Sequence, residues 1–186
     1  MLNIMVLTGS PHKRGTTAQL ADSFCRGAAE AGHTIERFDA AQLQVHRCTG
    51  CGKCSGGKEL CIFQDDMEKI YSGLKKADLI VFVTPLYYHT MTAYLKTVID
   101  RFYAVNSRIK GGKGALLIAA AAASESWNFD ALKAWFQTEL RYLSWKNFGM
   151  ICAEGCAVPA DLKQTSYPEQ AWEKGHMLPE SIEISS

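Results

Sequence analysis

Apolar residues occur along this chain in two patterns, short unbroken runs and helical repeats that separate them. Unbroken runs are typical of strands buried on both faces of a parallel sheet. They fall within residues 2–7, 78–83, 115–120 and 149–153. Residues 33–38 instead alternate polar and apolar side chains, which predicts a strand with one wet face at a sheet edge. Apolar residues at helical spacing between these segments, such as Leu20, Phe24 and Ala28, predict the helices.

Strands that alternate with helices require right-handed crossovers and hence a parallel sheet. We therefore expect an α/β fold with a doubly wound, five-stranded parallel sheet, strand order 2-1-3-4-5 and helices on both faces. In that order the loops after the first and third strands diverge at a switch point, where ligands bind. The domain is expected over residues 1–155, including a cysteine-rich loop at 40–64. Residues 156–186 are expected to form a C-terminal tail with one short helix from about Pro168 to Gly175.

The first strand runs into a polar segment, residues 9–17, from which a helix leaves. Thr16 is expected to cap this helix, with Gln19 completing a capping box. Such a turn directs unpaired backbone N–H groups and the positive end of the helix dipole at one spot, which suits a phosphate. The segment matches neither the Walker pattern nor the three-glycine dinucleotide fingerprint, and the alternative is a turn without a ligand.

The third strand ends at Pro85, and the loop that follows is expected to face the same crevice as the polar segment. Its Tyr87 and Tyr88 either stack on a flat ligand ring or pack as loop aromatics. Trp127, beside the loop after the fourth strand, either reaches the ligand or packs in the core. Three charged residues of the helix after Pro85 are expected on a solvated face: Lys96, Asp100 and Arg101.

The composition of the chain limits the classes of function and of partner that we expect. The chain has 186 residues, of which 47% are hydrophobic and 21% charged, as in an ordinary globular domain. A net charge of +1 gives no electrostatic reason to expect nucleic acid or an anionic membrane as a partner. No apolar run reaches the ~18–20 residues of a membrane-spanning helix, and the N-terminal run is expected to be a strand, not a signal peptide. We expect a cytoplasmic protein.

Four of the seven cysteines, Cys48, Cys51, Cys54 and Cys61, have the spacing C-x2-C-x2-C-x6-C. Four thiolates this close together can surround an iron–sulfur cubane, because the short gaps let a loop turn each sulfur toward a common centre. The spacing leaves open a structural zinc, a disulfide, or free thiols. The remaining Cys25, Cys152 and Cys156 are expected to act as small buried hydrophobes.

Three segments together resemble a known family. Residues 9–17, 48–54 and 84–101 are similar to those of the flavodoxin-like NAD(P)H-dependent FMN reductases, and most similar to the iron–sulfur flavoprotein branch. The resemblance spans about residues 2–155. It implies FMN with its phosphate in the first loop and its ring against the Pro85 loop, NAD(P)H as co-substrate, and a [4Fe–4S] cluster on the four cysteines. It also implies a homodimer or homotetramer in which a second subunit helps to build the flavin pocket.

The FMN-binding positions that this resemblance implies lie in three loops. They are Ser10, His12, Arg14, Gly15, Thr16 and Thr17 in the first, Pro85, Leu86, Tyr87, Tyr88 and His89 in the second, and Ala122, Ala123, Ser124 and Glu125 in the third. His89 departs from the small residue that is usual in relatives, and the alanine-rich third loop preserves little of its usual glycine character.

The resemblance implies an FMN-dependent NAD(P)H oxidoreductase of the flavin or quinone reductase type. Electrons would pass to a small acceptor such as a quinone or free flavin, and single electrons would be exchanged with the cluster if it is present. No catalytic side chain is expected, because the cofactor performs the chemistry. The alternative is a one-electron carrier or a flavin-binding regulatory module, although carriers that resemble flavodoxin are usually strongly acidic and this chain is not.

Overall fold

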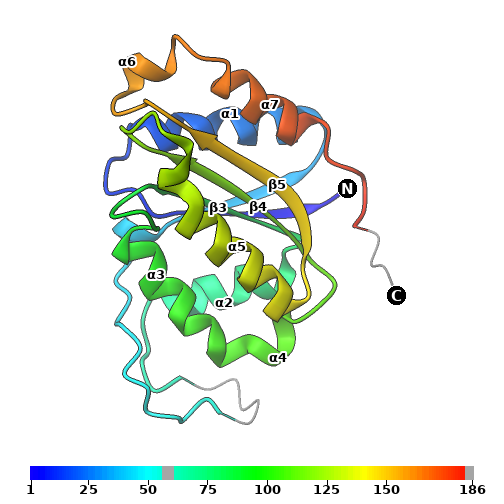
Figure 1. Ribbon diagram of the computed structural model, residues 1–186. Coiled ribbons are helices and arrows are strands. Elements are labelled where there is room, and N and C mark those ends of the chain that lie inside the picture. The colour runs from blue at the N-terminus through cyan, green and yellow to red at the C-terminus, as the bar shows by residue number, and fades with distance from the viewer. Residues whose placement is uncertain (56–60, 183–186) are drawn as a thin grey trace.

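The computed structural model describes residues 1–55 and 61–182 and contains one parallel sheet (Figure 1). Its strands are β1 (Asn3–Thr8), β2 (Thr34–Asp39), β3 (Leu79–Pro85), β4 (Gly114–Ala120) and β5 (Lys146–Ala153). They pair in the order β2-β1-β3-β4-β5, and every pair is parallel. The predicted fold class and strand order are therefore confirmed.

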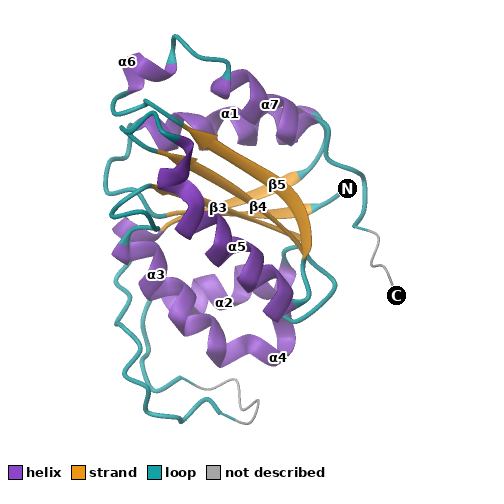
Figure 2. Cartoon of the chain, in the orientation of Figure 1, coloured by secondary structure: helices purple, strands orange, loops and turns teal. Residues whose placement is uncertain are grey.

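Helices cover both faces of the sheet (Figure 2). On one face lie α1 (Thr16–Glu30), α6 (Pro159–Leu162) and α7 (Tyr167–His176). On the other lie α2 (Met67–Lys76), α3 (Ala93–Asp100), α4 (Asn106–Ile109) and α5 (Asp130–Leu143). Short 3-10 turns are η1 (Ala40–Gln42), η2 (Arg101–Val105) and η3 (Ser126–Phe129). No helix in residues 1–55 and 61–182 combines the length and the apolar character needed to cross a membrane.

Burial explains the apolar patterns. Strand β4 is buried along its whole length, as are nearly all of β1 and the central strand β3, which accounts for their unbroken apolar runs. Strand β2 lies at one edge and alternates in burial, as predicted for residues 33–38. Strand β5 forms the other edge and begins at Lys146, three residues before the predicted start at Gly149, because its exposed first residues carry no apolar signal.

The tail helix α7 packs against α1 at very short range. A Cβ atom placed on Gly27 of α1 would lie 2.1 Å from the Trp172 carbonyl oxygen, and one on Gly175 of α7 would lie 2.2 Å from the Phe24 carbonyl oxygen. Each helix therefore offers a glycine where the other's backbone approaches. A helix lies where the tail helix was predicted, and it completes the layer that covers this face of the sheet. The tail also contains the short helix α6, which the sequence analysis did not predict.

The start of α1 corrects one expectation. The residue that precedes the helix is Gly15, in an extended conformation, and Thr16 is already the first helical residue. The predicted cap by the Thr16 side chain is wrong, because a capping side chain must come from the residue just outside the helix. The Thr16 hydroxyl is instead buried and has no hydrogen-bond partner within residues 1–55 and 61–182.

We predict that Gly175→Ala lowers the free energy of unfolding by about 1–3 kcal/mol, because the added methyl group meets backbone that cannot move aside easily. Urea denaturation would measure the change. Glu173→Ala, at an exposed position of the same helix, is the matched control and should change stability by less than about 0.5 kcal/mol. Equal free energies of unfolding for the two variants would show that α1 and α7 can move apart without loss of stability.

Candidate functional site

A cavity of about 580 Å³ opens at the carboxyl ends of the strands, where the doubly wound order predicts a ligand. Loops after β1, β3, β4 and β5 all contribute to its walls. The lining residues are Ser10, His12, Lys13, Arg14, Gly15, Thr16, Thr17, Pro85, Leu86, Tyr87, Ala120, Ala121, Ala122, Cys156, Ala157, Val158 and Pro159.

The loop after β1 curls around itself at the amino end of α1. The Ser10 hydroxyl accepts a hydrogen bond from the His12 N–H at 3.1 Å, and the Gly15 N–H donates to the His12 carbonyl, also at 3.1 Å. A Cβ on Gly15 would lie 3.0 Å from the His12 Cβ, so a larger residue would crowd the curl. The unpartnered Thr16 hydroxyl lines the cavity here, at the positive end of the helix dipole. A buried polar atom without a protein partner fits an anionic ligand group at this position.

Thr92, the residue that caps α3, holds the two main loops together. Its hydroxyl donates to the Gly9 carbonyl at 2.7 Å and accepts from the Leu95 N–H at 3.4 Å. Its own N–H donates to the Thr84 hydroxyl at 3.1 Å. The bond to Gly9 joins the loop after β1 to the start of α3, and the bond to Thr84 ties the same residue to the end of β3. Both loops therefore face one crevice, as predicted.

The loop after β3 turns tightly at two aromatic residues. Tyr88 and His89 have φ angles of 47° and 65°, and reciprocal backbone hydrogen bonds between Tyr87 and Thr90 close the turn. Bulky residues with positive φ are strained, and such strain occurs most often at functional sites. The turn leaves Tyr88 98% exposed. The His89 ring stacks on that of Trp127, with 5.4 Å between centroids. Because Trp127 is 60% exposed, its predicted alternative role in the core is wrong.

Ten of the expected FMN-binding residues line the cavity, and five do not. Those outside its lining are Tyr88, His89, Ala123, Ser124 and Glu125. Sequence reasoning missed the wall formed by Cys156 to Pro159, which follows β5. The parallel topology could have predicted this wall, because every loop that follows a strand emerges at the same edge of the sheet. Cys156 is buried, as expected, whereas Cys25 and Cys152 are only partly buried. The roles of all these residues in cofactor binding stay predictions.

A second hollow, of about 440 Å³, is lined by Cys48, Cys51, Cys54 and Cys61. Burial raises the pKa of the Cys54 thiol, and the other three thiols add to this shift, so they lie near enough to Cys54 to act on its charge. Among the described residues, no group of three or more His, Cys, Asp or Glu side chains is gathered closely enough to hold a metal ion. The donor set fits a cluster, but ligation requires the thiols to draw together. Residues 56–60 of the loop lie outside the described part of the chain.

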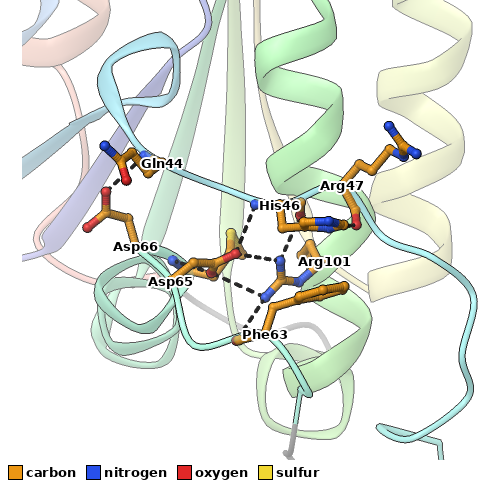
Figure 3. A network of polar contacts seen from close by, with 8 residues as sticks. Gln44, His46, Arg47, Phe63, Asp65, Asp66 and Arg101 are labelled. Atoms are coloured by element: carbon orange, nitrogen blue, oxygen red, sulfur yellow. Dashed lines mark hydrogen bonds and ion pairs between the residues drawn. The ribbon is translucent and has the colours of Figure 1, made fainter.

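The base of this cysteine loop is tied to Arg101 (Figure 3). The guanidinium forks onto the Asp65 carboxylate with N–O distances of 2.9 and 3.3 Å. It also donates to the His46 carbonyl at 2.7 Å. Arg101 is only 2% exposed, so its expected place on a solvated helix face is wrong. The expectation holds for Lys96 and Asp100, which form an exposed ion pair.

Arg101 and Asp65 are a buried ion pair whose opposite charges compensate each other. Burial disfavours the charged guanidinium, but its hydrogen bonds with Asp65 and the neighbouring Tyr71 hydroxyl group together more than offset this and raise the pKa of Arg101; the Tyr71 contact falls short of hydrogen-bond geometry. Burial likewise opposes ionisation of Asp65, while hydrogen bonds from Arg101 and two backbone N–H groups lower its pKa below the usual value. Burial also raises the pKa of Tyr71 to about 12, although the guanidinium opposes this. Among the residues that the structure describes, neither the Tyr71 hydroxyl nor the Arg101 Nε has a hydrogen-bond partner.

Comparison with known proteins agrees with this geometry. A family model described as NADPH-dependent FMN reductase matches residues 2–149. An iron-sulfur flavoprotein of Archaeoglobus fulgidus is 29% identical over 167 residues, which cover 86% of this chain and 74% of the relative. An iron-sulfur flavoprotein of Methanocaldococcus jannaschii is 31% identical over 123 residues, which cover 63% of this chain and 61% of that one. The chain thus spans about three-quarters of the first relative and three-fifths of the second.

Solved structures show the same fold at low sequence identity. The NAD(P)H:quinone oxidoreductase from Methanothermobacter marburgensis superposes with a TM-score of 0.69 at 17% identity, over 94% of each chain. An azoreductase from Bacillus anthracis superposes with a TM-score of 0.74 at 18% identity, over 96% of this chain and all of the other. These similarities support the flavodoxin-like fold.

Proposed function

The chain belongs to the NADPH-dependent FMN reductase family and is an NAD(P)H-dependent FMN oxidoreductase; we propose that FMN occupies the cavity at the carboxyl edge of its sheet. The observation that supports this placement is the Thr16 hydroxyl, which is buried in the cavity wall without a partner at the amino end of α1. A phosphate there would accept the hydrogen bond that the Thr16 hydroxyl does not make within the described part of the chain. Its negative charge would also be stabilised by the positive end of the helix dipole.

The residues around the cavity have distinct tasks in this proposal. The loop after β1 binds the phosphate through Thr16, Thr17 and the backbone, with Lys13 and Arg14 adding positive charge. Pro85, Leu86 and Tyr87 supply an apolar wall that orients the ring and excludes water. When bound, FMN supplies hydride acceptance and the release of one or two electrons. No side chain is required as a nucleophile or as an obligatory proton donor.

The acceptor that we propose is a small planar molecule such as a quinone or a free flavin. Exposed aromatic side chains support this choice: Tyr87 lines the cavity, Tyr88 follows it in the same turn, and Trp127 stacks on His89 of that turn, so flat apolar surface lies close to the cavity wall. The two solved structures are named as a quinone oxidoreductase and an azoreductase, which agrees with a small organic acceptor. A homodimer or homotetramer stays a prediction, which light scattering of the purified protein would decide.

An anaerobic reduction experiment tests the enzyme against the alternative of a one-electron carrier or regulatory module. NADH or NADPH is mixed with the FMN-loaded protein, and flavin absorbance is followed before and after addition of a quinone. We expect bleaching by at least one nucleotide and repeated turnover with the quinone. Reduction by dithionite but by neither nucleotide would contradict turnover and favour the carrier.

Thr16→Val is predicted to weaken FMN binding about 10- to 100-fold, because one hydrogen bond to a charged group contributes about 1.5–3 kcal/mol. Fluorescence titration of the FMN-free protein measures the affinity. Thermal stability should change little, since the hydroxyl caps no helix and has no protein partner. Thr138→Val, on α5 and away from the cavity, is the control. An unchanged affinity in Thr16→Val would place the phosphate elsewhere.

We also propose that Cys48, Cys51, Cys54 and Cys61 hold a [4Fe–4S] cluster, which supplies one-electron storage when bound. Support comes from their spacing, from the single hollow that they line, and from relatives named iron-sulfur flavoproteins. The positive φ angles of Gly50 and Gly52 let the loop turn sharply between the thiols.

Metal analysis of anaerobically purified and reconstituted protein tests this site. We expect about four iron and four sulfide per chain, falling sharply in Cys51→Ala but not in the control Cys25→Ala, since Cys25 lies on α1, outside the hollow. Zinc in place of iron would favour the structural-metal alternative. Full FMN occupancy with neither metal would reject the cluster while leaving the reductase intact.

A further inference from the structure

The two arms of the cysteine loop, residues 43–47 and 61–66, converge on one buried guanidinium. Arg101 donates from Nη1 to the His46 carbonyl at 2.7 Å and from Nη2 to the Phe63 carbonyl at 3.5 Å. The same two nitrogens fork onto the Asp65 carboxylate (Figure 3). One side chain therefore contacts both arms at the point where the loop leaves the body of the domain.

The arms are also joined directly to each other. The Asp65 carboxylate accepts from the His46 N–H at 2.9 Å, and the Asp66 carboxylate accepts from the Gln44 N–H at 2.9 Å. The His46 and Phe63 rings stack with 3.8 Å between centroids and 15° between planes. None of these contacts involves a cysteine, so the base of the loop is closed before any ligand joins the thiols.

Arg101 connects this closure to the flavin cavity. It lies where α3 passes into η2, and the other end of α3 begins at Thr92. Thr92 is bonded to Gly9, in the loop after β1, and to Thr84, near the end of β3. One short helical element thus reaches from the loops of the cavity to the base of the cysteine loop, and it fixes the position of one relative to the other.

We infer that Arg101 is a positioning residue for the cysteine site: it holds the loop closed, with its four thiols around one hollow, before metal is bound. The inference rests on the proposed metal-binding role of those cysteines. An arginine suits the task because its planar fork serves a carboxylate and two carbonyls at once, which the single ammonium of lysine does not. Asp65 compensates the charge, so Arg101 acts through the direction of its hydrogen bonds.

The test compares three full-length variants with the wild type, each loaded with FMN. Arg101→Lys keeps the charge and loses the fork. Arg101→Met/Asp65→Asn removes the ion pair without leaving one charge buried alone, which would endanger the fold. Lys96→Met is the matched control, because it breaks an exposed ion pair on the same helix.

Three quantities are measured on each variant. Hydrogen exchange before iron is added reports opening of residues 44–47, where the His46 and Gln44 N–H groups bond across the base. FMN affinity reports the cavity. The rate at which a chelator removes iron after reconstitution reports the cysteine site.

We expect exchange in residues 44–47 to rise about tenfold or more in the double variant, since charge-assisted bonds are lost, and to rise less in Arg101→Lys. Iron loss should follow the same order, with FMN affinity within about twofold of wild type in every variant. Wild-type exchange at 44–47 in the double variant would overturn the inference. A loss of FMN affinity together with the rise in exchange would also overturn it, because Arg101 would then support the fold as a whole and not the cysteine loop in particular. If wild-type protein binds no metal, the cluster proposal fails separately, and the exchange comparison still decides the loop closure.

Discussion

The buried side chain of Thr92 forms the connection on which the rest of the site depends. Its hydroxyl bonds the Gly9 carbonyl and caps α3, while its N–H bonds Thr84. The space for this contact is narrow, since a Cβ on Gly9 would lie 2.7 Å from both the Thr92 hydroxyl and the Leu95 Cβ. The loops after β1 and β3, which diverge because the strand order reverses between them, are thereby held at a fixed separation. A cavity shaped for one cofactor requires such a constraint, because separate flexible loops would pay the ordering entropy on binding.

The sheet could be predicted from the sequence because its signal is local. Doubly buried strands produce unbroken apolar runs, and the alternation at residues 33–38 marked an edge. Prediction failed where the outcome depends on contacts between distant residues. Arg101 carries a charge and was therefore expected at the surface, yet it is buried because Asp65 lies beside it in space. The Thr16 cap failed for a different reason: the helix began one residue earlier than the side-chain pattern suggested.

The candidate site shows the same division. Spacing identified the four thiols and the polar loop after β1, because both are encoded within a few residues of one another. The wall from Cys156 to Pro159 has no motif of its own and lies at the cavity only because β5 ends there. Similarly, the turn at Tyr88 and His89 does not have the glycines that usually mark positive φ angles, so its strain was visible only in the structure.

Arg101 could affect the four thiols through its charge or through the position in which it holds the loop. Asp65 shares the charge at short range, and burial leaves the pair little contact with solvent, since the side chains are 2% and 12% exposed. An ion pair whose charges are matched this closely has a weak field at a distance, so it contributes little to the electrostatic potential at the cysteines. Its hydrogen bonds, in contrast, depend strongly on direction and hold both arms of the loop. Arg101 therefore fixes where the thiols are more than how acidic they are, and the glycines between them provide the freedom to close around a ligand.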